Sequence, residues 1–175
     1  MKTKLTTTLA TVLILFAALV STPAAEPKPV YSATAASDVL AAACQQAAKE
    51  SKLVFLKSGY PECSWCRVFD KFHGKPEVQK IIGKYYVVAV IDWEDMPDGK
   101  AVFGQYAKIG APSWVILTPD KKVIIDSYAP SGNVGFPGAP DETKYYLAAL
   151  KKATPAITAD ELQILSDQIQ KAMQK

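Results

Sequence analysis

Residues 53–66 read LVFLKSGYPECSWC, an apolar run followed closely by two cysteines, Cys63 and Cys66, three positions apart. The run predicts a buried strand, and the apolar periodicity of residues 64–72 predicts a helix. Cys63 therefore stands at a helix N-terminus, where unpaired N–H groups and a partial positive charge stabilise a thiolate. Cys66 lies one turn away, close enough for a disulfide. The pair has the minimum equipment for thiol–disulfide exchange, a nucleophilic thiol and a resolving thiol.

A purely structural disulfide is the other interpretation of this pair. Cross-linking two residues so close in sequence removes little entropy from the unfolded chain, so stability is a poor reason for the bond. That argument, together with the placement at a helix start, favours a redox-active pair. The third cysteine, Cys44, shares a helix face with Leu40 and Ala47 and is expected to be a small buried residue. The alternative for Cys44 is a regulatory or intermolecular thiol.

The first 25 residues have the pattern of a secretory signal peptide. Two lysines precede an apolar run from Leu9 to Val20, and the small residues 21–25 follow it. We expect cleavage after Ala24 or Ala25 and a periplasmic or secreted product. A membrane span needs about 20 apolar residues, so none is expected after signal removal. A retained N-terminal anchor is the alternative.

The charge balance and the ligand-type residues exclude several function classes. Without Lys2 and Lys4, the 20 basic residues become 18 against 17 acidic ones, a net charge of +1 that gives no reason to expect nucleic acid as a partner. No G-x-G-x-x-G pattern is present, so no bound organic cofactor is expected.

His73 follows Cys66 by seven positions, and two helical turns of about 11 Å are too far for one coordination sphere. No metal site is therefore expected, and His73 is instead placed at a helix C-terminus, where an imidazolium is favoured.

The remainder of the chain predicts a single α/β domain over residues 37–153. Residues 26–36, rich in Pro and Ala, are expected to form a flexible lead, and Ser37 is expected to cap the first helix. The expected helices lie at 37–49, at 64–72, from 76 and at 100–108, and the expected strands at 52–57, 86–91, 113–118 and 123–126, with a loop at 129–140. Residues 154–175 are expected to form a C-terminal amphipathic helix packed on the domain, opened by a capping box at Thr158–Glu161. Strands alternating with helices predict a mixed sheet with helices on both faces.

Taken together, these motifs resemble the thioredoxin superfamily over residues 37–152. Four stretches carry the resemblance, in the family's order and at its separations: Ala48–Leu56, Cys63–Cys66, Pro76–Val78 and Gly110–Ser113. Any one of them alone is a weak signal, but the four together are specific. The resemblance is strongest to exported thioredoxin-like proteins, whose members assist disulfide reduction or cytochrome assembly. It implies a three-layer thioredoxin-like fold with an extra C-terminal helix.

The resemblance also assigns roles around the disulfide. It implies that Pro112 follows a cis peptide bond and packs beside the disulfide, and that the backbone of Ala111 pairs with an extended substrate segment; X–Pro bonds are the ones for which cis costs little. The chain departs from thioredoxin in having Ser-Trp between its cysteines and no carboxylate within residues 56–58, where thioredoxin keeps a buried one. Glu62 is the nearest carboxylate in sequence and is expected to be exposed. How Cys66 loses its proton is therefore left open.

We accordingly expect an extracytoplasmic thiol–disulfide oxidoreductase that acts on protein thiols or disulfides and works with a redox partner protein. Cys63 is the expected nucleophile and Cys66 the resolving thiol, with Pro112 and Ala111 shaping the substrate groove. Trp65 is expected near the nucleophile, either as a docking patch for substrate or as cover for the edge of the core. The alternative function is a non-catalytic binding or assembly module of the same fold, for example one that delivers copper, whose disulfide never cycles.

Overall fold

The computed structural model describes residues 34–174. The signal peptide predicted at 1–25 and residues 26–33 of the predicted lead lie outside this range. The elements in chain order are α1 (Ala36–Glu50), β1 (Leu53–Gly59), α2 (Ser64–His73), α3 (Pro76–Tyr85), β2 (Tyr86–Asp92), α4 (Gly99–Phe103), β3 (Ser113–Leu117), β4 (Val123–Asp126), β5 (Tyr128–Ala129), β6 (Gly132–Asn133), α5 (Pro140–Ala153) and α6 (Ala159–Met173). None of these helices has the length and apolar character needed to cross a membrane.

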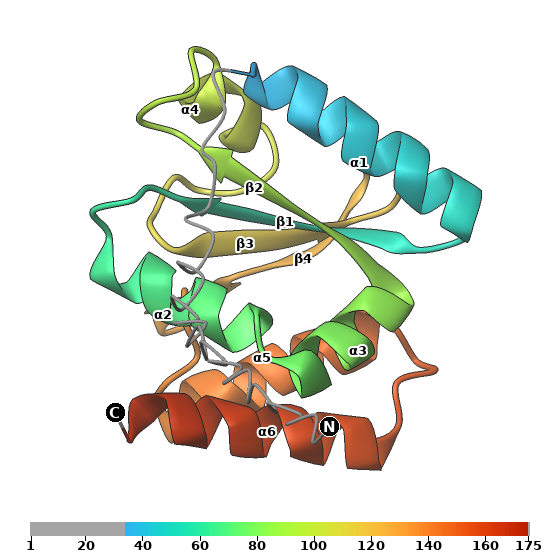
Figure 1. The fold of residues 1–175 in the computed structure, drawn as a ribbon, viewed down its shortest axis with the longest axis vertical. Helices are drawn as coiled ribbons and strands as arrows, with labels where there is room; N and C mark the ends of the chain where they lie inside the picture. Colours follow the sequence, from blue (N-terminus) through green and yellow to red (C-terminus); the bar gives the residue numbers. More distant parts are fainter. Residues whose placement is uncertain (1–33, 175) are drawn as a thin grey trace, which may run out of the picture. The chain divides into compact units, whose positions relative to one another are not determined.

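The central sheet is mixed, as the sequence predicts. Its strand order is β2-β1-β3-β4, with β1 parallel to β2 and antiparallel to β3, and β3 antiparallel to β4. Helix α1 covers one face of this sheet, and α2, α3, α5 and α6 gather on the other (Figure 1). The result is the expected three-layer thioredoxin-like fold with an extra C-terminal helix.

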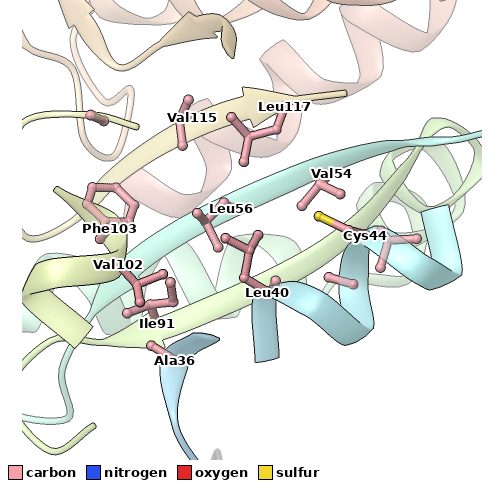
Figure 2. Packing of buried hydrophobic residues seen from close by; sticks show 14 of the residues in the cluster. Ala36, Leu40, Cys44, Val54, Leu56, Ile91, Val102, Phe103, Val115 and Leu117 are labelled. Atoms are coloured by element: carbon pink, nitrogen blue, oxygen red, sulfur yellow. The ribbon is translucent and has the colours of Figure 1, made fainter. Parts of the chain in front are cut away.

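Strand β1 contributes to the hydrophobic clusters on both faces of the sheet, because its side chains alternate between the two faces. Val54 and Leu56 face α1, where they join an aliphatic cluster that includes Leu40 and Cys44 (Figure 2). Phe55 faces the other way and stacks on Trp114 of β3, with ring centroids 5.7 Å apart. Trp114 is fully buried and serves in packing.

The C-terminal helix is anchored at its start and along one side. The Thr158 hydroxyl accepts a hydrogen bond from the backbone N–H of Glu161 at 3.2 Å, and the Glu161 carboxylate accepts one from the Thr158 N–H at 2.9 Å. This is the capping box that the sequence predicts. Leu165 and Ile169 are fully buried in the same cluster as Phe55. The apolar stripe of α6 therefore packs on its own domain.

The prediction that Ser37 caps the first helix is wrong. Helix α1 begins at Ala36, and its first two N–H groups donate to the Asp98 carboxylate, from Ala36 at 2.6 Å and from Ser37 at 3.1 Å. A carboxylate at a helix N-terminus satisfies unpaired donors and complements the helix dipole, so it replaces a local cap. A hydrogen bond with the Ser37 side chain lowers the pKa of Asp98, and the two backbone hydrogen bonds add to that effect. The start of α1 is thus set by a residue 61 positions beyond Ser37, just before α4.

Two further segments differ from the expectation. Helix α4 ends at Phe103, whereas the sequence pattern predicts helix to residue 108, and Ala107 still reaches the core from the segment that follows. The Gly- and Pro-rich segment 129–140, expected as a plain loop, contributes to the small β5–β6 hairpin. This segment matters for the site because it packs against Pro112.

Candidate functional site

The two cysteines lie at the junction that the sequence predicts, between the end of β1 and the start of α2. Cys63 is the N-cap residue of α2, and its sulfur accepts a hydrogen bond from the backbone N–H of Cys66 at 3.1 Å. The two residues form a disulfide with their Cα atoms 5.2 Å apart. Cys63 retains 8% of its surface exposed and Cys66 only 3%. On reduction, the sulfur of Cys63 would occupy a position where the helix dipole favours negative charge.

A cis proline lies beside the disulfide, as the resemblance implies. The Ala111–Pro112 peptide bond is cis, and Pro112 is buried while Ala111 is partly exposed. Pro112 and Cys66 line one narrow crevice that has no room for a water molecule. Gly59 closes it from β1, and a Cβ atom at that position would come within 3.2 Å of the Cys66 sulfur. The close packing of β1 against α2 behind the disulfide therefore favours a glycine at position 59.

The segment after β5 holds Pro112 in place, which the sequence analysis did not anticipate. The Asn133 side-chain amide donates to the Pro112 carbonyl at 2.9 Å, and the Trp114 indole N–H donates to the Gly135 carbonyl at 3.0 Å. A Cβ atom at Gly135 would fall 2.6 Å from the Pro112 carbonyl oxygen, so the chain there needs glycine to pass so closely. The signal in the sequence is Phe136, the sole aromatic residue of segment 129–140.

Trp65 is half-exposed beside the nucleophile. Its ring retains 51% exposure and stacks on Phe136, with centroids 6.0 Å apart and planes 15° from parallel. Phe136 is itself buried against Phe69 and Phe72, so one side of Trp65 covers the core edge. The other side of the ring faces solvent. Trp65 thus combines the two roles that the sequence analysis kept open.

Tyr60, three residues before Cys63, has an aromatic partner of its own. Tyr60 packs edge-to-face on Trp93, with ring centroids 5.5 Å apart. Trp93 follows the end of β2 and gains a packing role that its sequence position did not indicate.

Glu62 is exposed and the β1 segment 56–58 carries no carboxylate, both as expected. The strand position that faces α2 is instead occupied by Lys57, which is 4% exposed and forms a salt bridge with Asp70 of α2. Burial lowers the pKa of Lys57, and the charge and hydrogen bond of Asp70 oppose that effect. Neither Lys57 nor Asp70 was singled out from the sequence as a site residue. The available signal was the spacing of Asp70, four residues after Cys66 on one helix.

The expectation of an imidazolium at His73 is wrong. His73 does end α2, but its ring packs against Phe55 and Phe69, with centroid distances of 5.3 and 4.6 Å. Its Nε2 atom lies 3.3 Å from the Tyr146 hydroxyl, within hydrogen-bond distance. Burial, with a smaller contribution from the charge of Lys57, holds the pKa of His73 well below its ordinary value. The cost of desolvating a cation exceeds the mild benefit of the helix C-terminus.

Neither the third cysteine nor a metal-binding cluster adds to the site within the described residues. Cys44 is buried in the aliphatic core, and burial raises the pKa of its thiol, which agrees with a packing role rather than a reactive one. Residues 34–174 contain no group of three or more His, Cys, Asp or Glu side chains placed to hold a metal ion.

The fold, the disulfide at the start of α2 and the cis proline beside it define a protein of the thioredoxin superfamily. Residues 35–172 match the family Thioredox_DsbH, described as "Protein of unknown function, DUF255", and the chain belongs to this family.

Relatives and a solved structure agree with this placement. An uncharacterized protein of Caenorhabditis elegans, B0495.5, is 33% identical over 106 residues, which are 56% of this chain and 14% of that protein. Human spermatogenesis-associated protein 20 is 31% identical over 85 residues, 45% of this chain and 11% of that protein. The chain thus spans only a small part of these relatives. The crystal structure of a disulphide isomerase from Xylella fastidiosa Temecula1 superposes with a TM-score of 0.53 at 18% identity, covering 84% of this chain and 98% of that one, which supports the fold.

His73 makes stability depend on pH in a defined direction. It is the only histidine in the chain, and the unfolded form takes up a proton below about pH 6.5 that the folded form excludes. Stability should therefore be complete above that pH and fall as the pH is lowered, by about 1 kcal/mol between pH 6.5 and 5.5. His73→Gln should lack this loss. Urea unfolding of both proteins across this range measures it, and parallel curves for the two would contradict a neutral buried His73.

Proposed function

We propose that this protein is an extracytoplasmic thiol–disulfide oxidoreductase that exchanges disulfides with protein substrates through Cys63 and Cys66. The observation that carries the proposal is the Cys63–Cys66 disulfide, closed at a helix N-terminus beside a cis proline. A bond that closes so short a loop adds little stability, whereas the helix start favours the thiolate that exchange requires.

The different exposure of the two cysteine residues supports the proposed order of use of their sulfurs. Cys63, the more accessible residue, attacks the substrate disulfide as a thiolate, and one substrate sulfur leaves as a thiolate. Cys66 then attacks Cys63, which restores the protein disulfide and releases the second substrate sulfur. Two electrons pass from the protein dithiol to the substrate, and the reverse sequence would oxidise a substrate dithiol. The direction in the cell follows from the reduction potential of the pair relative to its partner.

The surface around Cys63 has the features of a site for an extended polypeptide. Ala111 lies immediately before Pro112 and β3, is partly exposed, and is proposed to pair its backbone with the substrate. Trp65 offers an exposed apolar face next to the nucleophile, supported from below by Phe136. An apolar surface beside a reactive sulfur suits unfolded or flexible protein segments better than small polar thiols.

Export to the periplasm or the cell exterior is part of the proposal and rests on the pattern of residues 1–25. An exported protein would meet the oxidising conditions in which disulfide chemistry is general. N-terminal sequencing of the protein recovered outside the cytosol should begin at Ala25 or Glu26. Recovery of the protein only in the cytosol, with Met1 in place, would contradict export.

Cysteine variants should separate the two sulfur roles. Cys63→Ser should reduce the rate of disulfide reduction in a model protein such as insulin to the uncatalysed background, because no nucleophile remains. Cys66→Ser should accumulate a mixed disulfide with the substrate, visible by mass spectrometry, because resolution is blocked.

Cys44→Ala is the matched control, since Cys44 is buried in the aliphatic core, and should retain activity. Wild-type activity in Cys63→Ser would exclude the mechanism. A wild-type Cys63 that alkylates no faster than an ordinary thiol at mildly acidic pH would favour the non-catalytic binding module.

Trp65→Ala should weaken the reaction with protein substrates selectively. Loss of a half-exposed aromatic contact is expected to raise KM for a protein substrate about tenfold. The rate with a small-molecule disulfide should stay near that of the wild type, because such a substrate does not need the patch. Val123→Ala on β4, which removes a similarly exposed apolar side chain, serves as the control. An equal loss with both substrates would instead indicate an effect on the disulfide itself.

A further inference from the structure

A buried ion pair lies directly behind the disulfide. Lys57 projects from the centre of β1 toward α2, and its ammonium donates a hydrogen bond to the Asp70 carboxylate. The same ammonium lies 5.2 Å from the centroid of the Phe69 ring. The Lys57 side chain is 5% exposed and that of Asp70 is 28% exposed, so the carboxylate is the member of the pair that reaches solvent.

This ion pair shares a crevice with the resolving cysteine. Lys57, Asp70 and Cys66 all line the narrow space closed by Gly59 and Pro112. Cys66 and Asp70 are four residues apart on α2, so their side chains lie on the same face, one turn apart. The crevice has no room for water, so the nearest groups that can exchange a proton with Cys66 are those of the protein.

Stability is a weak explanation for the pair. Desolvating a lysine and a carboxylate costs several kcal/mol per ion, and an apolar pair of similar volume often serves a core equally well. Phe69 and Phe72 show that apolar side chains fill the neighbouring positions of α2. The Lys57–Asp70 pair lies where β1 and α2 meet the disulfide. This placement points to a role in thiol–disulfide exchange.

We propose, on the basis of the function proposed above, that Asp70 accepts the proton of the Cys66 thiol when the mixed disulfide is resolved, and that Lys57 is the positioning residue that holds this carboxylate at the crevice. The carboxylate that the sequence lacks on β1 is thereby supplied from α2.

In the reducing direction, resolution of the mixed disulfide moves one proton and exchanges one S–S bond for another. The Cys66 thiol gives its proton to Asp70, and the Cys66 sulfur attacks the Cys63 sulfur. The Cys63–Cys66 bond forms while the bond between Cys63 and the substrate sulfur breaks. The electron pair leaves with the substrate thiolate, which takes a proton from solvent. Asp70 then returns its proton to water at its exposed edge. In the oxidising direction the same groups return the proton to Cys66.

No other described group competes for this role. On α2, His73 lies one turn beyond Asp70 but is packed among aromatic rings. Strand β2 contributes Val90 to the crevice and the segment before β3 contributes Pro112, and neither side chain is titratable. Glu62 precedes Cys63 and is exposed. Lys57 and Asp70 are therefore the charged groups that line the crevice with Cys66.

The test isolates the resolving step. A mixed disulfide between Cys63 and a chromogenic thiol is formed, and release of that thiol is followed by stopped flow from pH 6 to 9.5. Asp70→Asn should slow release by about 100-fold near pH 6.5, the scale of a lost general base. The deficit should shrink as the pH rises, because at higher pH a thiol loses its proton without the help of a general base. The initial attack by Cys63 should be unchanged.

Further variants distinguish a proton acceptor from a structural contact. Asp70→Glu should release the thiol at a rate close to that of the wild type. Lys57→Met should release it more slowly, and its deficit should shrink less with rising pH than that of Asp70→Asn. Glu62→Gln and Glu77→Gln, which remove exposed carboxylates near the starts of α2 and α3, are the controls and should match the wild type. Urea unfolding of each oxidised variant verifies folding.

Three outcomes would overturn the proposal: wild-type release rates in Asp70→Asn at all pH values, a deficit in that variant that persists unchanged at pH 9.5, or a selective defect in Glu62→Gln. Each of these leaves the proposed function standing, provided that the wild type forms and resolves the mixed disulfide. A wild type that never forms the mixed disulfide would refute the proposed function itself.

Discussion

Strand β1 is hydrogen-bonded on both edges and buried on both faces, and the geometry of the site follows from this constraint. Its parallel partner β2 and its antiparallel partner β3 fix the strand along its length. Val54 and Leu56 tie it to α1, while Phe55 ties it to the aromatic core beneath α2. The strand has little freedom to shift, so the turn that follows delivers Cys63 to a fixed position. A strand at the sheet edge would hold that turn less firmly.

The same constraint gathers the other parts of the site from distant segments. Register pairs Ser58 of β1 with Ser113 of β3, which brings the cis Ala111–Pro112 bond to the end of the strand where the cysteines lie. The segment after β5 is then fastened to Pro112 through Asn133 and carries Phe136 under Trp65. The disulfide, the proline and the apolar patch thus meet because β3 begins beside the end of β1.

Features with local causes could be predicted from the sequence, and features with distant causes could not. The strand–Cys-x-x-Cys–helix order and the cap at Thr158 depend on neighbouring residues, and both are present. The start of α1 depends on Asp98, which is far away in sequence, so the local cap assigned to Ser37 was wrong. The pKa of His73 depends on the rings that surround it in the folded state. Its position at a helix C-terminus predicted a shift toward the charged form, whereas the pKa is lowered. Spacing along one helix does indicate Asp70, but its partner on β1 becomes visible only when the layers are assembled.

The division of the ion pair between strand and helix has a physical rationale. A carboxylate on β1 at position 57 would be nearly fully buried, and a proton taken from Cys66 would have no direct route to water. On α2 the carboxylate can face Cys66 across one turn and still reach solvent. The buried position then suits a cation with a long apolar stem, whose ammonium lies over the Phe69 ring and reaches Asp70. The lysine in the strand therefore allows proton transfer near the resolving sulfur without burying an unpaired negative charge in the core.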